Sequence, residues 1–187
     1  MHRRPAFTYD HVVSEIAFPA FDEHGKATIL HSGDDNAPPV SQPFRGNSPG
    51  GSAFYTGDKW PEAYRHTFFL ADAWFPSHSR WIQNVVVDAD NQIIEIKEFV
   101  SPDSVEFPVD MTTDAQGYGL YIMDYLGKVY RISYDCNSNG VGDDVDLVRG
   151  SSSDCGGLLG NGIPDECEDD LNQDGRADTC EILTTWP

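Results

Sequence analysis

The stretch of residues 107–135 constrains the fold most, because a run of short strands stops there and a chemically different segment begins. Its β-branched and aromatic runs are interrupted by glycine at the reversals. This pattern predicts three antiparallel strands, at residues 108–113, 119–124 and 128–134. Asp135 then opens an acidic segment, so the sequence predicts a β domain followed by a polar tail.

Composition places the same boundary. Residues 1–134 hold 21 of the 22 aromatic residues and no cysteine, whereas residues 135–187 hold all four cysteines. The tail has 13 Asp and Glu residues against two arginines, so it carries −11 of the formal charge of −19. Charge this negative disfavours nucleic acid and anionic membrane surfaces and favours cations. We therefore expect two domains, 1–134 and 135–187, and calcium ions as partners of the second.

The sequence also bears on where the protein works. It has no run of 18 apolar residues, so we expect no membrane span. Residues 1–13 include basic residues but lack the apolar core of a signal peptide. Four cysteines in a glycine-rich acidic tail favour an oxidising compartment. We expect a secreted or cell-surface protein whose export signal lies upstream of Met1, and the alternative is a cytosolic chain with reduced thiols.

The rest of the first domain also consists of short segments with strand composition. We expect strands at residues 15–21, 27–31, 52–55, 66–71, 80–87 and 92–99. Helical periodicity is almost absent, which predicts an all-β fold. Groups of three strands recur with a period of roughly 40 residues, which favours β-propeller blades. A β-sandwich is the alternative.

Several motifs between residues 38 and 134 add to this interpretation through their order and spacing. They are GGSAFYTG at 50–57, PEAY at 61–64, FFLAD at 68–72, GLYIMDY at 119–125 and GKVYRI at 127–132. This series resembles the soluble glucose/sorbosone dehydrogenase family. The resemblance implies a six-bladed propeller that oxidises sugars with pyrroloquinoline quinone (PQQ). The chain would then be a partial β-propeller, holding the last two to three blades.

The residues that carry the resemblance have structural roles, and the family's cofactor-binding and catalytic residues are not among them. The paired glycines, Gly50 and Gly51, are expected to permit a tight turn with positive φ. Many family members carry an R-x-R-D run whose arginines contact the quinone; here Phe107 and Val109 replace both arginines, and Asp110 remains. The blade that carries the family's catalytic histidine is also absent from this chain. We therefore expect the chain alone to be noncatalytic. We expect PQQ as a cofactor only if the full-length protein is an active member of the family.

The alternative function is a noncatalytic propeller that binds carbohydrate or a surface protein. Four histidines are candidate catalytic bases, and none has a nucleophile or paired carboxylate at an informative spacing: His11, His31, His66 and His78. Asp110 and Asp124 lie on neighbouring predicted strands and could pair. We expect them instead to cap turns and strand ends.

The tail contains two matches to the calcium-loop pattern D-x-[DN]-x-[DN]-G-x5-E. In this pattern oxygen ligands come from positions 1, 3, 5, 7, 9 and 12, and glycine at position 6 makes a sharp turn. The last match predicts the ligands Asp170, Asn172, Asp174, Arg176 (through its carbonyl), Asp178 and Glu181. The first predicts Asp135, Asn137, Asn139, Val141 (through its carbonyl), Asp143 and Asp146.

A middle copy is degenerate. Residues 161–168 match positions 5 to 12, but Asp154 is displaced by three residues, so positions 1 and 3 would fall on Gly157 and Leu159. We do not count it as an independent full site. The three copies resemble thrombospondin type 3 repeats and dockerin loops. Residues 147–153 leave no room for a proper helix, which favours a calcium-wrapped spacer or attachment tail, and a disordered acidic linker is the alternative.

Four cysteines allow three disulfide connectivities. We favour Cys136–Cys155 and Cys167–Cys180, because each closes a modest loop between successive copies. The tail has few large apolar groups, so its core cannot offset the entropy lost on ordering its backbone. We therefore expect the tail to fold only with calcium.

Overall fold

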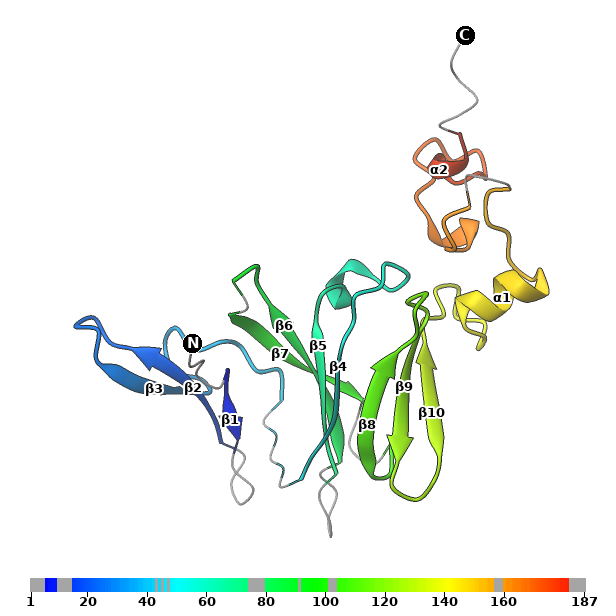
Figure 1. Cartoon of the computed structure of the whole chain (residues 1–187). Helices are drawn as coiled ribbons and strands as arrows, with labels where there is room; N and C mark the ends of the chain where they lie inside the picture. The colour runs from blue at the N-terminus through cyan, green and yellow to red at the C-terminus, as the bar shows by residue number, and fades with distance from the viewer. Residues whose placement is uncertain are drawn as a thin grey trace.

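The structure is a computed structural model that describes residues 6–9, 15–42, 44, 46, 48–73, 80–90, 92–100, 104–156 and 160–181. Its strands form three antiparallel sheets that follow one another in chain order, and the tail extends beyond one end of the strands (Figure 1). The expected all-β class is confirmed. Two candidate bases from the sequence, His11 and His78, lie outside the described residues.

Each sheet is built from strands in chain order. The first sheet holds β1 (Thr8–Tyr9), β2 (Ile16–Phe21) and β3 (Ala27–His31). The middle sheet holds β4 (Pro49–Phe54), β5 (Phe68–Asp72), β6 (Trp81–Val87) and β7 (Ile93–Val100), and a short 3-10 helix, η1 (Glu62–Tyr64), lies between β4 and β5. The last sheet holds β8 (Pro108–Thr113), β9 (Gly119–Asp124) and β10 (Val129–Ser133). The strands predicted at 27–31, 108–113 and 119–124 match at both ends.

The middle sheet has four strands where the sequence predicted a group of three. The additional member of the sheet is β4, a strand that the sequence predicted at 52–55 outside that group; it begins at Pro49 and pairs antiparallel with β5. The expected positive φ at Gly50 and Gly51 is wrong, because neither lies in the left-handed region. Their role is close approach: a Cβ on Gly51 would lie 2.2 Å from the carbonyl carbon of Asp110, and one on Gly50 would lie 2.0 Å from the carbonyl oxygen of Pro108. The glycine pair thus lets β4 lie directly against β8.

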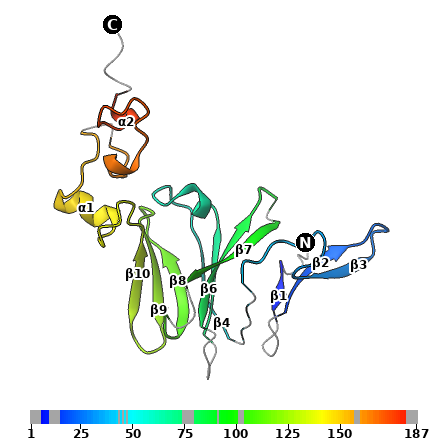
Figure 2. The ribbon, with the colours of Figure 1, turned by 180° about the vertical axis from the view of Figure 1, so that it is seen from behind.

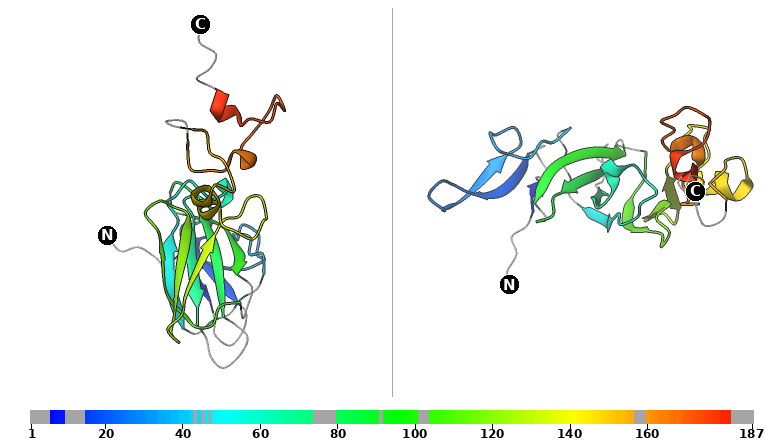
Figure 3. Two further views of the ribbon diagram at one scale, coloured as in Figure 1. Left: turned by 90° about the vertical axis from the view of Figure 1, so that its right-hand side faces the viewer. Right: turned by 90° about the horizontal axis from the view of Figure 1, so that it is seen from above.

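The middle sheet is buried on both faces, which explains why the first five residues of β6 are buried, the polar Gln83 and Asn84 among them. On one side Trp81 and Val85 pack in a cluster with Phe18 of the first sheet. On the other side Ile82 packs in a cluster with Ile122 of the last sheet. Figures 2 and 3 show the same succession of sheets from behind and from above. The middle sheet therefore holds its two neighbours in place.

A buried carboxylate ties the first sheet to the middle one. Asp72, at the end of β5, is fully buried and accepts hydrogen bonds from the Tyr9 hydroxyl and the Ser48 backbone N–H, both at 3.1 Å. Burial, and then the charge of Asp72, raise the pKa of Tyr9. The phenol therefore stays protonated as a donor.

The tail contains more helix than the sequence predicted. It holds α1 (Asp143–Arg149), the 3-10 helix η2 (Asp165–Cys167) and α2 (Asp178–Glu181). The expectation of no room for a helix is wrong, because α1 begins inside the first loop, at position 9, rather than after it. Gly150, with φ of 72°, ends α1 in the left-handed conformation. Within the ranges given above, no helix is long and apolar enough to cross a membrane.

The predicted disulfide pairing is also wrong. The bonds are Cys136–Cys167 and Cys155–Cys180, with sequence separations of 31 and 25 residues. Each bond joins the cysteine at position 2 of one copy to the cysteine at position 11 of the next. The copies stack so that positions 2 and 11 of successive copies meet. The pairing of the cysteines therefore follows this stacking, and not their closeness in the sequence, on which the prediction was based.

The close approach of β4 and β8 makes Gly51→Ala a sharp test of the sheet packing. The added methyl group would meet backbone atoms that no rotamer change can move. We expect the free energy of unfolding to fall by about 2 kcal/mol or more, measured by urea denaturation. Ser52→Ala, at an exposed neighbouring position, is the control and should change it by less than about 0.5 kcal/mol. Equal stability of the two variants would contradict the contact.

The disulfide arrangement has its own test. Peptide mapping of the oxidised chain under nonreducing conditions should recover Cys136 linked to Cys167 and Cys155 linked to Cys180. Loss of one bond should destabilise the tail by roughly 2–4 kcal/mol. Recovery of peptides that link Cys136 to Cys155 would contradict the stacking of the copies.

Candidate metal centre

The first copy, residues 135–146, curls around its own carboxylates. Asp135 accepts backbone N–H bonds from Asn139 at 3.1 Å and Gly140 at 2.7 Å. Asp143, which lies at position 9 and starts α1, accepts the N–H of Cys136 at 2.9 Å. Carboxylates at positions 1 and 9 are thereby turned toward the interior of the loop.

The third copy, residues 170–181, repeats this pattern. Asp170 accepts the N–H groups of Asp174 at 3.2 Å and Gly175 at 2.9 Å. Asp178, at position 9, accepts the N–H of Leu171 at 3.3 Å. The two copies therefore share one backbone arrangement, although they lie more than 30 residues apart in the sequence.

The residue at position 12 closes each loop. The side-chain amide of Asn139 donates to Asp146 at 2.8 Å, and that of Asn172 donates to Glu181 at 3.1 Å. Asn139 also accepts the N–H of Val141 at 2.8 Å. The side chains predicted as ligands are thus linked by hydrogen bonds within each loop. The carbonyl ligands predicted at Val141 and Arg176 remain predictions.

The middle copy, residues 154–168, adopts the same arrangement despite its insertion. Asp154 accepts the N–H groups of Asn161 at 3.0 Å and Gly162 at 2.8 Å, as a position-1 carboxylate does in the other two copies. The prediction that Gly157 takes position 1 is therefore wrong. The extra residues 157–159, Leu159 among them, lie outside the described residues.

Two further bonds complete the likeness of the middle copy to its neighbours. Asp165, at position 9, accepts the N–H of Cys155 at 2.9 Å, and the side-chain amide of Asn161 donates to Glu168, at position 12, at 2.5 Å. The sequence signal for Asp154 is the Asp-Cys pair that opens both this copy and the first one. A pattern with fixed spacing misses Asp154, because the three inserted residues separate it from the rest of the copy.

The backbone of each loop needs the left-handed conformation at fixed positions. The position-6 glycines have φ between 79° and 88°: Gly140, Gly162 and Gly175. Ser138 and Gln173, at position 4, have φ of 59° and 58°. Glycine at position 6 avoids a Cβ clash there, so the turn that directs several N–H groups at one carboxylate is sterically permitted.

Burial, hydrogen bonds and neighbouring charges shift the pKa values of these carboxyl groups in different directions. Burial raises the pKa of Asp143, and the charges of Asp135 and Asp146 raise it further, against the lowering effect of the Cys136 N–H. A side-chain hydrogen bond with Asp174 raises the pKa of Glu181. Side-chain hydrogen bonds from Ser151 and Asn139 lower the pKa of Asp146. Asp143 and Glu181 thus hold a proton more tightly than an isolated carboxyl group, and Asp146 holds it less tightly.

The cysteines do not contribute ligands in this arrangement. Asp143 lies close to the sulfurs of Cys136 and Cys167, and Asp165 lies close to those of Cys155 and Cys180. Both sulfur pairs are disulfides, so no thiolate is present to bind a metal. The available donors are oxygen atoms, which suit calcium or magnesium rather than zinc.

The other sequence candidates have structural roles. Asp124 is buried and accepts N–H bonds from Phe107 and Leu126, both at 2.6 Å, so it caps a turn as expected. His31 lies 2.6 Å from Glu15, and both side chains are about half exposed. His66 is exposed and has φ of 59°. Neither histidine is placed beside a nucleophile in the described part of the chain.

Comparisons with known proteins leave the loops of the tail and the sheets to be interpreted from their own geometry. No protein-family model matches this chain. No curated protein and no solved structure matches it either.

Proposed function

We propose that the tail is a calcium-binding segment with one ion in the first copy and one in the third. The observation that carries this proposal is the shared arrangement of the two loops, each of which also has an oxygen-bearing side chain at position 3, which the middle copy lacks. In both, the carboxylates at positions 1 and 9 are aimed inward by N–H groups of the same loop positions. An independent acidic linker has no reason to repeat such bonds in two separate segments.

The donor set supports calcium over other metals. Each loop offers five side chains with oxygen donors and one carbonyl, which suits the six to eight ligands of calcium. Magnesium demands stricter octahedral geometry and keeps several of its waters. Asparagines in place of aspartates lower the ligand charge: Asn137, Asn139 and Asn172. We therefore assign extracellular-type affinities of about 10⁻⁵ to 10⁻³ M.

Calcium would act mainly by removing repulsion. The tail has a formal charge of −11 in 53 residues, and the described part of it has one small buried cluster, formed by Cys155, Ala177 and Cys180. Such a core cannot alone offset an ordering cost of about 1–2 kcal/mol per residue. Binding of cations and ordering of the loops are thus coupled, and the two disulfides restrict the unbound ensemble.

For the β domain we propose the last blades of an exported glucose/sorbosone dehydrogenase-like propeller. Three successive sheets stacked face to face are consistent with propeller blades, and the motif glycines and Asp72 occupy packing positions that support the resemblance. Two disulfides fit an oxidising compartment. The alternative is a noncatalytic module that binds carbohydrate or a surface protein and is displayed on the tail.

The residues at the start of β8 do not suit the family's quinone. Phe107 packs under the Arg80 guanidinium, which lies 4.6 Å from the centre of its ring, and Val109 is 42% exposed. A cofactor with several carboxylates calls for bidentate cationic partners, and these apolar side chains offer none. We therefore derive no reaction step through PQQ from this chain.

The calcium proposal predicts binding that can be counted. Calorimetric titration of the chelator-treated chain with calcium should show two ions bound, with a gain of ordered structure in circular dichroism. Asp174→Ala should remove one ion and leave the other, because Asp174 supplies position 5 of the third copy only.

Asp169→Ala is the matched control for that variant. It removes the same charge from an exposed neighbouring position that is not a ligand position, so both ions should remain. Absence of binding at 10 mM calcium, or the same ordered structure in chelator, would refute the proposal.

The chain alone should not oxidise sugars. We expect no dye reduction when it is mixed with PQQ, calcium and a panel of sugars, because the cofactor arginines are replaced by Phe107 and Val109. Phe107→Arg/Val109→Arg is the comparison for cofactor affinity, measured by the quinone absorbance, and should bind more quinone than the parent chain. Turnover that is abolished by changing a residue of this chain would contradict the prediction.

A further inference from the structure

In the described part of the chain, the tail meets the β domain beside the connection and again at a place far away along the sequence. Beside the connection, the Arg131 guanidinium lies 2.7 Å from Asp144 of α1, and Gly142 packs against Ser133. Both contacts lie within 13 residues along the chain, so the short connection brings them together. At the distant place, the Lys59 ammonium donates to the carbonyl of Asn161 at 2.5 Å, across 102 residues. This contact has no short connection to explain it.

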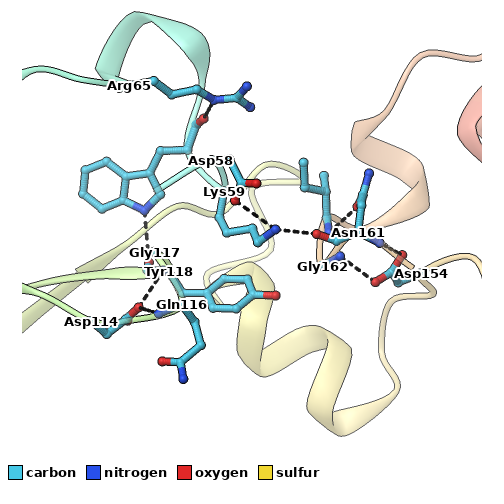
Figure 4. Close-up of polar contacts among 12 residues, drawn as sticks. Asp58, Lys59, Arg65, Asp114, Gln116, Gly117, Tyr118, Asp154, Asn161 and Gly162 are labelled. Atoms are coloured by element: carbon cyan, nitrogen blue, oxygen red, sulfur yellow. Dashed lines mark hydrogen bonds and ion pairs between the residues drawn. The ribbon is translucent and has the colours of Figure 1, made fainter. Parts of the chain in front are cut away.

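Lys59 is held in place for that contact. Its side chain is only 18% exposed, low for a lysine, and its ammonium also lies 2.9 Å from Asp58 (Figure 4). The middle copy uses the amide N–H and the side chain of Asn161 for its own loop. The carbonyl of Asn161 is thereby left for Lys59.

The shape of the middle copy fits the same surface. A Cβ on Gly162 would lie 2.2 Å from the Tyr118 hydroxyl oxygen and 3.2 Å from Cε of Lys59. The equivalent glycines of the other copies, Gly140 and Gly175, have no atom of the described residues within 4 Å of such a Cβ. Only the middle copy is thus packed against the β domain through its position-6 turn.

The receiving surface is itself rigid. The indole N–H of Trp60 donates to the carbonyl of Tyr118 at 3.0 Å, and Asp114 accepts the N–H of Tyr118 at 3.0 Å. Beneath them the buried Tyr55 hydroxyl donates to the carbonyl of Gly117 at 2.5 Å. The loop after β4 and the turn between β8 and β9 therefore form one surface, which Figure 4 shows facing the middle copy.

Holding the middle copy also holds the rest of the tail. Disulfides join it to the first copy through Cys167 and to the third through Cys155. A hydrogen bond from Asn137 to Glu166, at 3.0 Å, adds a second link to the first copy. A contact that holds Asn161 therefore restrains the position of all three copies.

We propose that the middle copy is a docking element that latches the tail onto the loop surface formed by Lys59 and Tyr118. With the latch closed, the middle copy has one direction relative to the sheets; with it open, the middle and third copies change direction while the first copy keeps its contacts with β10. Because disulfides join the middle copy to the two copies that are proposed to bind calcium, chelation of calcium opens the latch, and this last step alone rests on the proposed calcium binding.

The test compares one methyl group at three equivalent positions in the full chain. Gly140→Ala, Gly162→Ala and Gly175→Ala introduce the same strain at φ near 80°, but only Gly162→Ala meets the β domain. In saturating calcium we expect Gly162→Ala to increase the maximum dimension in X-ray scattering and to raise hydrogen exchange of the middle copy at least tenfold. The other two variants should keep the parent scattering profile.

A second variant distinguishes opening of the latch from unfolding of the middle copy. Lys59→Ala lies outside the tail and should open the latch while leaving both disulfides intact, whereas Lys97→Ala, which removes a lysine paired with Glu95 within β7, should not. The latch is overturned if Lys59→Ala scatters like Lys97→Ala, or Gly162→Ala like the other glycine variants. If these variants open the tail but calorimetry detects no calcium, the latch stands and the calcium proposal fails.

Discussion

Burial of the middle sheet on both faces is the constraint on which the β domain depends. Its strands must present apolar side chains in both directions, and β6 does so with Trp81 and Val85 on one side and Ile82 on the other. Neither outer sheet has a second described sheet to pack against. The buried side chains of the first and last sheets pack in clusters with those of the middle sheet, and packing there is close enough that β4 tolerates only glycine opposite β8.

The tail is held together by hydrogen bonds to carboxylates and by disulfides, and not by apolar packing as in the β domain. Its polar groups are arranged around anions, with backbone N–H groups directed at the carboxylates of positions 1 and 9 in each copy. Hydrogen bonds from N–H groups stabilise these charges only in part, as the raised pKa of Asp143 indicates. Disulfides between position 2 of one copy and position 11 of the next then set the spacing of the copies. Covalent links and charge compensation thus replace a hydrophobic core.

Features with a local cause could be predicted from the sequence, and features set by stacking could not. The pattern of alternating apolar residues and turn glycines predicted both ends of β8 and of β9 correctly, because where a strand starts and stops here depends on residues that are close in the sequence. The fixed spacing of carboxylate and amide side chains indicated the first and third loops for the same reason, and the two loops share their hydrogen bonds; ligand binding by them stays a prediction. The role of Asp154 was missed because an insertion breaks the spacing while the hydrogen bonds persist. The pairing of Cys136 with Cys167 depends on how copies stack, which no local pattern records.

Charge explains why the two parts of the chain meet where they do. Residues 1–134 have a formal charge of −8 and the tail has −11, so the two parts repel each other overall. Two of their contacts use cations of the β domain, where Arg131 faces Asp144 and Lys59 faces the middle copy. Repulsion between exposed charges falls off over about 10 Å at moderate salt, whereas contacts at hydrogen-bond distance persist. Each calcium ion bound by the tail would remove two negative charges from one side of this balance. Cation binding would therefore favour the docked arrangement by lowering the repulsion between the two parts, whichever loop holds the ion.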